Sequence, residues 1–423
     1  MTTVRALLRL VAANNWEVHQ MDVHNAFLHG DLRKEVYIKL PQGFTFSSPN
    51  KLPRLHKALY GLRQALRCWY EKLSTALAKA GFVQSYSDYS LFTYTRGSVE
   101  IRVLVYVDDL VVCGNDSEAI HKFKKYLGEC FHMKDLGKLK YFLGIEIARN
   151  KEGFMLTQRK YALDIVSETG LLGSRPAATP MEQNHHLASG TSPFIPEPAS
   201  YRRLVGRLIY LANTRPDLSY SVHILSQFMQ KLRERHMDAA LCVVLYLKGT
   251  AGQGILLSSR SNLQLSVYCD ADWGMCPLSR RSLTAYVALL GGSPISWKTK
   301  KQKVVSQSSC EAEYRAMSIA TREIMWLRQL LKDLGFQPNG PSRLICDIKS
   351  ALYIATNPVF HERTKHIEID CHRVRDSINS GVLTTAHIGT KEQLADLLTK
   401  ALGKVQFSNL MSKLGVCNLH APF

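Results

Sequence analysis

The sequence contains neither a Cys-x-x-Cys pair nor a hydrophobic run of the length that crosses a bilayer. Its ten cysteines are scattered, and several stand in apolar runs, where cysteine behaves as a small hydrophobic residue. This pattern excludes a zinc ribbon and a disulfide framework, and it predicts a reducing, intracellular environment. The first residues are not a signal peptide, because Arg5 and Arg9 interrupt any apolar segment. We therefore expect a protein that is neither secreted nor inserted in a membrane.

Acidic residues are also scarce relative to basic ones. The 423 residues include 54 Lys and Arg against 35 Asp and Glu, a formal net charge of +19. Such an excess points to a polyanionic partner, with nucleic acid as the first candidate. The hydrophobic content of 46% excludes wholesale disorder, and the length predicts two to four domains.

The segment Ile101–Gly114 is the most informative stretch of the chain. Two apolar runs rich in β-branched residues flank Asp108 and Asp109, which predicts a β-hairpin with both carboxylates at its tip. Taken alone, the pair is better explained as a hydrated turn, because Asp is a common turn residue. A third carboxylate would turn it into a Mg²⁺ site, since Mg²⁺ prefers hard oxygen ligands. Asp22, at the end of a strand predicted over residues 16–22, is the candidate, although a strand-terminal Asp is usually a turn former.

Hydrophobic periodicity indicates a mixed α/β chain with a break near its middle. Residues 173–200 are rich in Pro, Ser, Gly, Asn and His, which indicates a linker or long loop. The predicted helices cover residues 4–15, 65–80, 116–130, 158–170, 200–213, 217–232, 236–249, a long stretch from Ser308, 349–356, 366–379 and a last one from 390. The predicted strands cover 16–22, 35–44 (with a turn), the two arms of the hairpin, 139–147, 263–270, 286–290, 294–297, 343–347 and 382–388.

Five segments, in the same order and at the same spacing, resemble the reverse transcriptase of copia-type retrotransposons. They are Gln20–Leu32 (QMDVHNAFLHGDL), Leu59–Ala65 (LYGLRQA), Tyr106–Asp109 (YVDD), Lys140–Glu146 (KYFLGIE) and Ala178–Met181 (ATPM). By this resemblance Asp22, Asp108 and Asp109 are the metal-binding carboxylates of a polymerase palm. Phe27 falls where these enzymes place the aromatic gate against the ribose 2′-hydroxyl, although core packing also explains it. The resemblance further assigns Arg63, Gln64 and Tyr106 to substrate binding.

The C-terminal part resembles the RNase H domain that follows the polymerase in the same elements. The matching segments are Asp270–Gly274, Arg280–Ser282, Ile295–Trp297, Ser308–Tyr314 (SSCEAEY), Cys346–Asp347, Arg363–Asp370 and Gln393–Asp396. By this resemblance Asp270, Glu311, Asp347 and Asp396 form a second two-metal site, and His387 assists proton transfer or product release. Each carboxylate has a structural alternative: Ser308-x-x-Glu311 is also a helix capping box, Asp347 also fits an N-cap, and Thr390-x-x-Gln393 would place Asp396 in the second turn of the last helix.

The resemblance implies an α/β fold class with three parts and a tail. We expect a reverse transcriptase palm over residues 1–170, a linker with a helical thumb or connection over 171–260, an RNase H-like domain over 261–403 and a C-terminal tail over 404–423. The basic fingers strands that precede the Asp22 motif in the family are not in this sequence, so the polymerase half is expected to be incomplete.

Three functions follow as alternatives. The first is a retrotransposon-derived RNA-directed DNA polymerase with RNase H, using Mg²⁺ (or Mn²⁺), an RNA template, a DNA primer, dNTPs and an RNA–DNA hybrid. The second is RNase H activity alone, and the third is a non-catalytic nucleic-acid-binding relic of a transposable element. By resemblance the location would be a cytoplasmic virus-like particle or the nucleus, and other parts of the polyprotein are expected partners.

Overall fold

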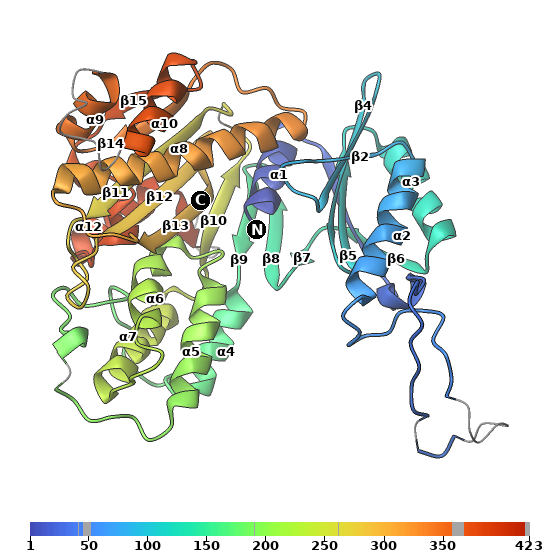
Figure 1. Cartoon of the computed structure of the whole chain (residues 1–423), viewed down its shortest axis with the longest axis horizontal. Helices are drawn as coiled ribbons and strands as arrows, with labels where there is room; N and C mark the ends of the chain where they lie inside the picture. Colours follow the sequence, from blue (N-terminus) through green and yellow to red (C-terminus); the bar gives the residue numbers. More distant parts are fainter. Residues whose placement is uncertain (41, 45–51, 190, 261, 358–367, 419–423) are drawn as a thin grey trace. The chain divides into compact units, whose positions relative to one another are not determined.

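The computed structural model describes residues 1–40, 42–44, 52–189, 191–260, 262–357 and 368–418, which form two compact units (Figure 1). Residues 14–140 make one unit; residues 1–13 and 141 onward make the other. The first unit is thus an insertion between helix α1 (Thr2–Ala13) and strand β7 (Tyr141–Phe142) of the second. No helix in the described part of the chain is both long and apolar enough to cross a membrane.

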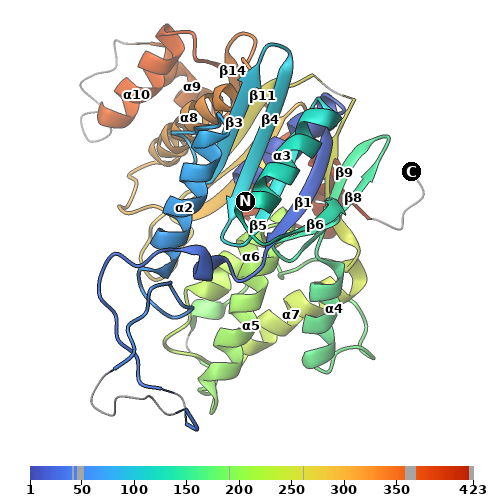
Figure 2. The same ribbon diagram turned by 90° about the vertical axis from the view of Figure 1, so that its right-hand side faces the viewer.

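The unit of residues 14–140 is a six-stranded sheet with two helices on one face (Figure 2). Helix α2 (Ala65–Lys79) buries an apolar stripe that includes Trp69 and Leu73, spaced by one helical turn. Helix α3 (Ser117–Cys130) is capped by Asp116, whose carboxylate accepts a hydrogen bond from the Ala119 amide. The sheet order is β2 (Val83–Gln84), β3 (Leu91–Arg96), β4 (Val99–Tyr106), β5 (Asp109–Gly114), β1 (Glu17–Val23) and β6 (Met133–Lys138).

The second unit contains a sheet that the sequence does not reveal. Its five strands are all antiparallel and come from distant parts of the chain. Neither short strands of this kind nor their long-range pairing leaves a periodic signal in the sequence. The order is β16 (Val416–Asn418), β10 (Gln253–Ser258), β9 (Gly153–Thr157), β8 (Ile145–Asn150) and β7.

A mixed sheet forms the other half of this unit. The first three of its strands along the chain form an antiparallel meander. The two later strands run parallel to the strand that begins the meander. The long helix α8 (Ser309–Asp333) lies across this sheet, with its apolar residues buried (Figure 1). The order is β13 (Ser293–Lys301), β12 (Leu283–Leu290), β11 (Leu265–Asp272), β14 (Ser342–Cys346) and β15 (Leu383–His387).

The remaining helices of the second unit are short. They are α4 (Arg159–Glu168), α5 (Pro198–Leu211), α6 (Ser219–Ser226), α7 (Glu234–Thr250), α9 (Lys349–Thr356), α10 (Glu368–Asn379), α11 (Asp396–Thr399) and α12 (Lys404–Lys413). Together the sheets and helices confirm the α/β fold class.

Helix α1 is buried in the second unit despite two arginines. The Arg5 guanidinium stacks 3.8 Å from the centroid of the Trp297 ring and donates hydrogen bonds to the carbonyls of Ile295 and Asn213, both at 2.7 Å. Residues 1–13 and 141–170, which the sequence assigns to the palm, therefore pack with the elements that follow.

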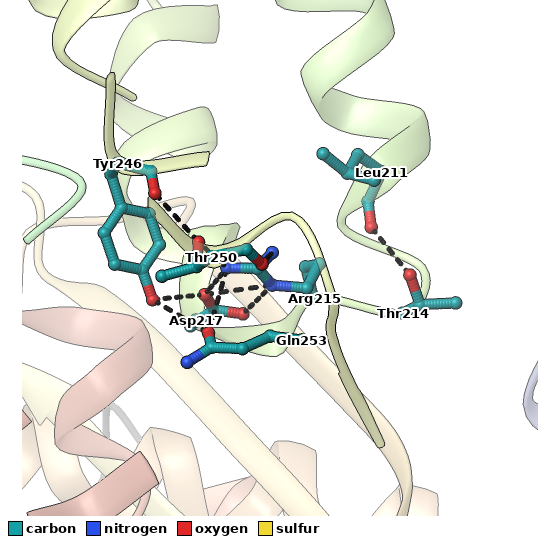
Figure 3. Close-up of polar contacts among 7 residues, drawn as sticks. All are labelled: Leu211, Thr214, Arg215, Asp217, Tyr246, Thr250 and Gln253. Atoms are coloured by element: carbon teal, nitrogen blue, oxygen red, sulfur yellow. Dashed lines mark hydrogen bonds and ion pairs between the residues drawn. The ribbon is translucent and has the colours of Figure 1, made fainter. Parts of the chain in front are cut away.

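A buried ion pair links the helical part of this unit (Figure 3). Arg215 and Asp217 are each about 1% exposed, and two guanidinium nitrogens of Arg215 donate to the Asp217 carboxylate at 2.6 and 3.0 Å. The Tyr246 hydroxyl donates to the same carboxylate at 2.8 Å, and Arg215 also donates to the carbonyl of Thr250. Removing one partner of such a pair leaves an uncompensated buried charge, which costs several kcal/mol, about 3–5, in stability.

Several sequence predictions about elements are wrong. The helix predicted over residues 217–232 ends at Ser226, and the described part of 35–44 has only an isolated bridge between Tyr37 and Arg54 in place of a strand. The strand predicted over residues 139–147 breaks at Leu143 and Gly144, which both have positive φ, where the Tyr210 hydroxyl donates to the Leu143 carbonyl. The helix predicted from residue 390 is a 3₁₀ turn over Thr390–Glu392, followed by the separate helix α11. Some predicted segments lie partly outside the described residues. They are the strand and turn predicted over 35–44, the helix predicted over 366–379 and the motif Arg363–Asp370.

Candidate active sites

Three carboxylates lie at one end of the β1–β5 strand pair. Asp22 and Asp109 are direct cross-strand partners, and Asp108 stands in the turn between β4 and β5. The Val23 amide donates to the Asp108 carbonyl at 2.9 Å, which ties the turn to β1. Burial raises the pKa of Asp109, and the charges of Asp108 and Asp22 add to this effect. The structure thus brings together all three residues that the sequence predicted for the first site.

The turn that carries Asp108 is held by a buried indole. Val107 has φ 56°, a conformation that costs a β-branched residue free energy and persists only where neighbours enforce it. The Trp69 indole N–H donates to the Val107 carbonyl at 2.7 Å, and the Trp69 ring packs edge-on against Phe131. Helix α2 therefore positions the hairpin through one side chain.

We expect Trp69→Phe to loosen the hairpin. The variant keeps most of the ring packing but leaves the Val107 carbonyl without its donor, so the free energy of unfolding should fall by about 1–3 kcal/mol. Hydrogen exchange should become faster at the amides of the turn. The matched control is Phe131→Leu, which weakens the ring packing and keeps the hydrogen bond. Equal exchange at the turn in both variants would contradict a specific role for the indole N–H.

An aromatic pair lies beside these carboxylates. The ring centroids of Phe27 and Tyr60 are 4.4 Å apart, and Tyr60 is 57% exposed. Burial raises the pKa of the Tyr60 hydroxyl, and the charges of Asp108 and Asp22 raise it further, which places Tyr60 near the carboxylates. The sequence prediction did not include Tyr60, although its motif, Leu59–Ala65, was recognised.

The other predicted substrate-binding residues are less closely tied to the carboxylates. Tyr106 is 57% exposed and pairs with Asp109 across the hairpin. Arg63 is exposed, and Gln64 is the N-cap residue of α2. Within the described ranges, no hydrogen bond joins the side chain of Arg63 or Gln64 to Asp22, Asp108 or Asp109. Their role in substrate binding stays a prediction.

A second carboxylate cluster is built around a half-buried lysine. The Lys400 ammonium donates to Asp396 at 2.7 Å and to Asp270 at 3.3 Å. Asp270, on β11, also accepts a hydrogen bond from the Thr399 hydroxyl. Burial raises the pKa of Asp396 to about 7, with the charge of Asp270 as the next cause. The sequence did not identify Lys400, although its spacing of four residues after Asp396 puts both on one face of a helical turn.

Glu313 and Asp347 complete this cluster. One oxygen of Glu313 accepts from the Ala271 amide at 2.8 Å, next to Asp270 in the chain. Burial raises the pKa of Glu313 well above its usual range, and the charge of Asp270 is the next cause. Asp347 follows β14, and one of its carboxylate oxygens is buried without a hydrogen-bond partner among the described residues.

The structure places Glu311 outside the cluster. Its carboxylate accepts from the Gln307 amide at 2.7 Å and from Arg315 at 2.9 and 3.0 Å, and the Ser308 hydroxyl accepts from the Glu311 amide. Glu311 therefore stabilises the first turn of α8. Residues two apart on a helix point in directions about 200° apart, so Glu313 faces the sheet in its place. The motif SSCEAEY contains both glutamates, so the sequence also offered Glu313 as a candidate metal ligand.

His387 lies beside the cluster, as the sequence predicted. Its imidazole Nε2 lies 3.1 Å from the Asp347 carbonyl, and His387 pairs with Cys346 across the β14–β15 strands. Asp396 is the first residue of α11, with Ala395 as the N-cap, rather than part of a helix that begins at Thr390. Asp347 is not an N-cap either, since Ile348 occupies that position for α9.

Both carboxylate sets suit a hard divalent cation. Each gathers at least three aspartate or glutamate side chains, the ligands that Mg²⁺ prefers. In the second set, one buried oxygen of Asp347 has no hydrogen-bond partner among the described residues. Burial, followed by the charge of Asp270, raises the pKa of Glu313 and Asp396, and a bound cation would oppose both effects. The residues therefore fit a metal at each site.

Known proteins resemble this chain over nearly its whole length. Residues 1–183 match the family model of the reverse transcriptase (RNA-dependent DNA polymerase). The chain is 44% identical over 416 residues to the retrovirus-related Pol polyprotein from transposon RE2 of Arabidopsis thaliana, covering 98% of this chain and 29% of that protein. It is 34% identical to the corresponding polyprotein from transposon TNT 1-94 of Nicotiana tabacum, covering 96% and 31%.

A shorter relative is matched over its full length. The putative transposon Ty5-1 protein of Saccharomyces cerevisiae is 35% identical over 308 residues, which are 72% of this chain and 100% of that protein. By contrast, the chain spans less than a third of the two plant polyproteins. It belongs to the reverse transcriptase family of copia-type retrotransposon Pol polyproteins.

Proposed function

We propose that this chain is the RNA-directed DNA polymerase and RNase H part of a retrotransposon polyprotein. The observation that carries the proposal is the presence of two separate carboxylate clusters, one on the β4–β5 hairpin and one at the ends of β11 and β14. The net charge of +19 supports an RNA template, a DNA primer and an RNA–DNA hybrid as partners, with dNTPs as substrates.

Each cluster would hold Mg²⁺, or Mn²⁺, through its own carboxylates. Asp22, Asp108 and Asp109 would serve the polymerase, and Phe27 with Tyr60 would contact the incoming nucleotide. In the nuclease, the metal ligands would be Asp270, Glu313, Asp347 and Asp396. Bound divalent ions supply charge neutralisation at the attacking and leaving oxygens of a phosphodiester. His387, next to Asp347, would move a proton at the leaving oxygen or assist product release.

Primer extension and hybrid cleavage, measured on the same preparation, test the proposal. Asp108→Asn should abolish extension and leave cleavage intact, because it removes one polymerase ligand only. Asp270→Asn should do the reverse. Extension that survives Asp108→Asn would refute the polymerase assignment, and cleavage that survives Asp270→Asn would refute the nuclease one.

RNase H activity alone is a second candidate. It is favoured by the nuclease cluster, whose carboxylates are buried and held by Lys400, Thr399 and the Ala271 amide, whereas the described contacts of the polymerase carboxylates are fewer. Cleavage without extension would support it. Binding of a hybrid with neither reaction would instead indicate a non-catalytic relic.

Cleavage should depend on pH through Asp396. Burial raises the pKa of this carboxyl to about 7, and a carboxyl binds Mg²⁺ in its ionised form. The ionised fraction rises from about one-tenth at pH 6 to about nine-tenths at pH 8, so the Mg²⁺ concentration for half-maximal cleavage should fall about tenfold. Mg²⁺ titrations of hybrid cleavage at both pH values measure this. An unchanged Mg²⁺ requirement would contradict it.

A further inference from the structure

Two buried thiols lie beneath the nuclease cluster. Cys269 immediately precedes Asp270 on β11, and Cys346 immediately precedes Asp347 on β14; both side chains are fully buried. The β11–β14 register pairs Tyr268 with Ile345, so the two cysteines are the next pair along these parallel strands. The two thiols lie close enough to interact, and the Cys269 thiol donates to the Ile345 carbonyl at 3.6 Å.

One of the two thiols, Cys346, contacts a carboxylate of the cluster directly. The Cys346 thiol donates to Oε2 of Glu313 at 3.7 Å. One donor atom from each of Glu313, Cys346 and Asp347 lies within 4.8 Å of the others. The donors of a tetrahedral ion at 2.0–2.3 Å stand about 3.3–3.8 Å apart, so small side-chain rotations bring these atoms to coordination distance.

Glu313 and Asp347, the two carboxylates at this corner, have no ion-pair partner in the described part of the chain. Lys400 contacts Asp270 and Asp396, and among the described residues no cationic side chain is hydrogen-bonded to Glu313 or Asp347. In the same part of the chain, a buried oxygen of Asp347 has no hydrogen-bond partner. Mg²⁺ would leave the sulfur atoms unused, whereas Zn²⁺ and Cd²⁺ bind thiolate and carboxylate together.

We propose that Cys269, Cys346, Glu313 and Asp347 form a site for a soft divalent ion, represented by Zn²⁺ or Cd²⁺. Two of its ligands, Glu313 and Asp347, belong to the proposed Mg²⁺ site, so the two kinds of ion exclude one another. Occupancy by Zn²⁺ therefore inhibits hybrid cleavage. This last consequence rests on the proposed nuclease function; the binding itself does not.

Cadmium binding tests the site without any nucleic acid. Titration of the reduced full chain with Cd²⁺ should produce a thiolate-to-cadmium charge-transfer absorption. Cys346→Ala should weaken the binding at least tenfold, and Cys269→Ala should lower the absorption per bound ion. The matched control is Cys113→Ala, at a fully buried cysteine of the other unit, and it should change neither quantity. Excess Mg²⁺ should weaken Cd²⁺ binding.

The outcomes separate this site from the proposed function. If Cys346→Ala and Cys269→Ala both titrate like Cys113→Ala, the site is refuted, whatever the chain cleaves. If the cadmium signal depends on both thiols but no hybrid is cut, the site stands and the nuclease proposal fails. Where cleavage occurs, Cys346→Ala should raise the Zn²⁺ concentration for half-inhibition at least tenfold. Unchanged inhibition would refute the overlap with the Mg²⁺ site.

Discussion

Glu313→Gln should reduce cleavage of an RNA–DNA hybrid by about a thousandfold or more, while Glu311→Gln should retain most of it. The carboxamide introduced by Glu313→Gln would keep the hydrogen bond from the Ala271 amide but lose the charge that faces Asp270 and Asp347. Metal ligation contributes several kcal/mol to transition-state stabilisation, and each 1.4 kcal/mol is about a factor of ten in rate.

The two variants form a matched pair within one helical turn. Glu311→Gln weakens the contacts with Arg315 and the Gln307 amide, so its main effect should be a loss of about 1 kcal/mol in the free energy of unfolding. Single-turnover cleavage at saturating Mg²⁺, with thermal unfolding of both variants, measures the contrast. If Glu311→Gln lost cleavage and Glu313→Gln kept it, the placement of Glu313 in the metal site would be wrong.

The choice between these glutamates shows where sequence information ends. Both occupy one motif, and Ser308-x-x-Glu311 predicts the start of a helix. The structure confirms that start, and for that reason Glu311 is engaged in capping and Glu313 faces the sheet. A capping motif indicates where a helix begins. It does not indicate which side of the helix faces β11, because tertiary packing decides that.

Local pattern predicted the rest of the fold unevenly. The helix predicted over residues 65–80 matches α2 to within a residue, and the apolar runs around Asp108 and Asp109 predicted the hairpin. The antiparallel sheet that contains β9 and β10 went unrecognised, since its pairing joins segments about a hundred residues apart. Likewise Lys400 and the thiol pair depend on the meeting of β11, β14 and α11, which no single stretch encodes.

Asp217→Ala should destabilise the second unit by about 3–5 kcal/mol. The substitution leaves the Arg215 guanidinium buried without its counter-charge, and an uncompensated buried charge is among the costliest single changes in a protein. The Tyr246 hydroxyl also loses its acceptor (Figure 3). Equilibrium urea unfolding followed by circular dichroism measures the loss. Glu152→Gln, which removes an exposed ion pair with Arg260 in the same unit, is the control and should leave the midpoint almost unchanged.

Removing the whole network should cost much less than removing one member. In the variant that combines Arg215→Met, Asp217→Leu and Tyr246→Phe, no buried charge is left to be desolvated, and apolar groups of similar size fill the space. The Thr250 hydroxyl keeps its hydrogen bond to the Tyr246 carbonyl. Most of the stability lost in Asp217→Ala should therefore return. If the combined variant were as unstable as Asp217→Ala, the ion pair itself would be a net source of stability. Recovery would instead show that the pair specifies how the loop before α6 meets α7, since Arg215 and Asp217 precede α6 and Tyr246 lies on α7.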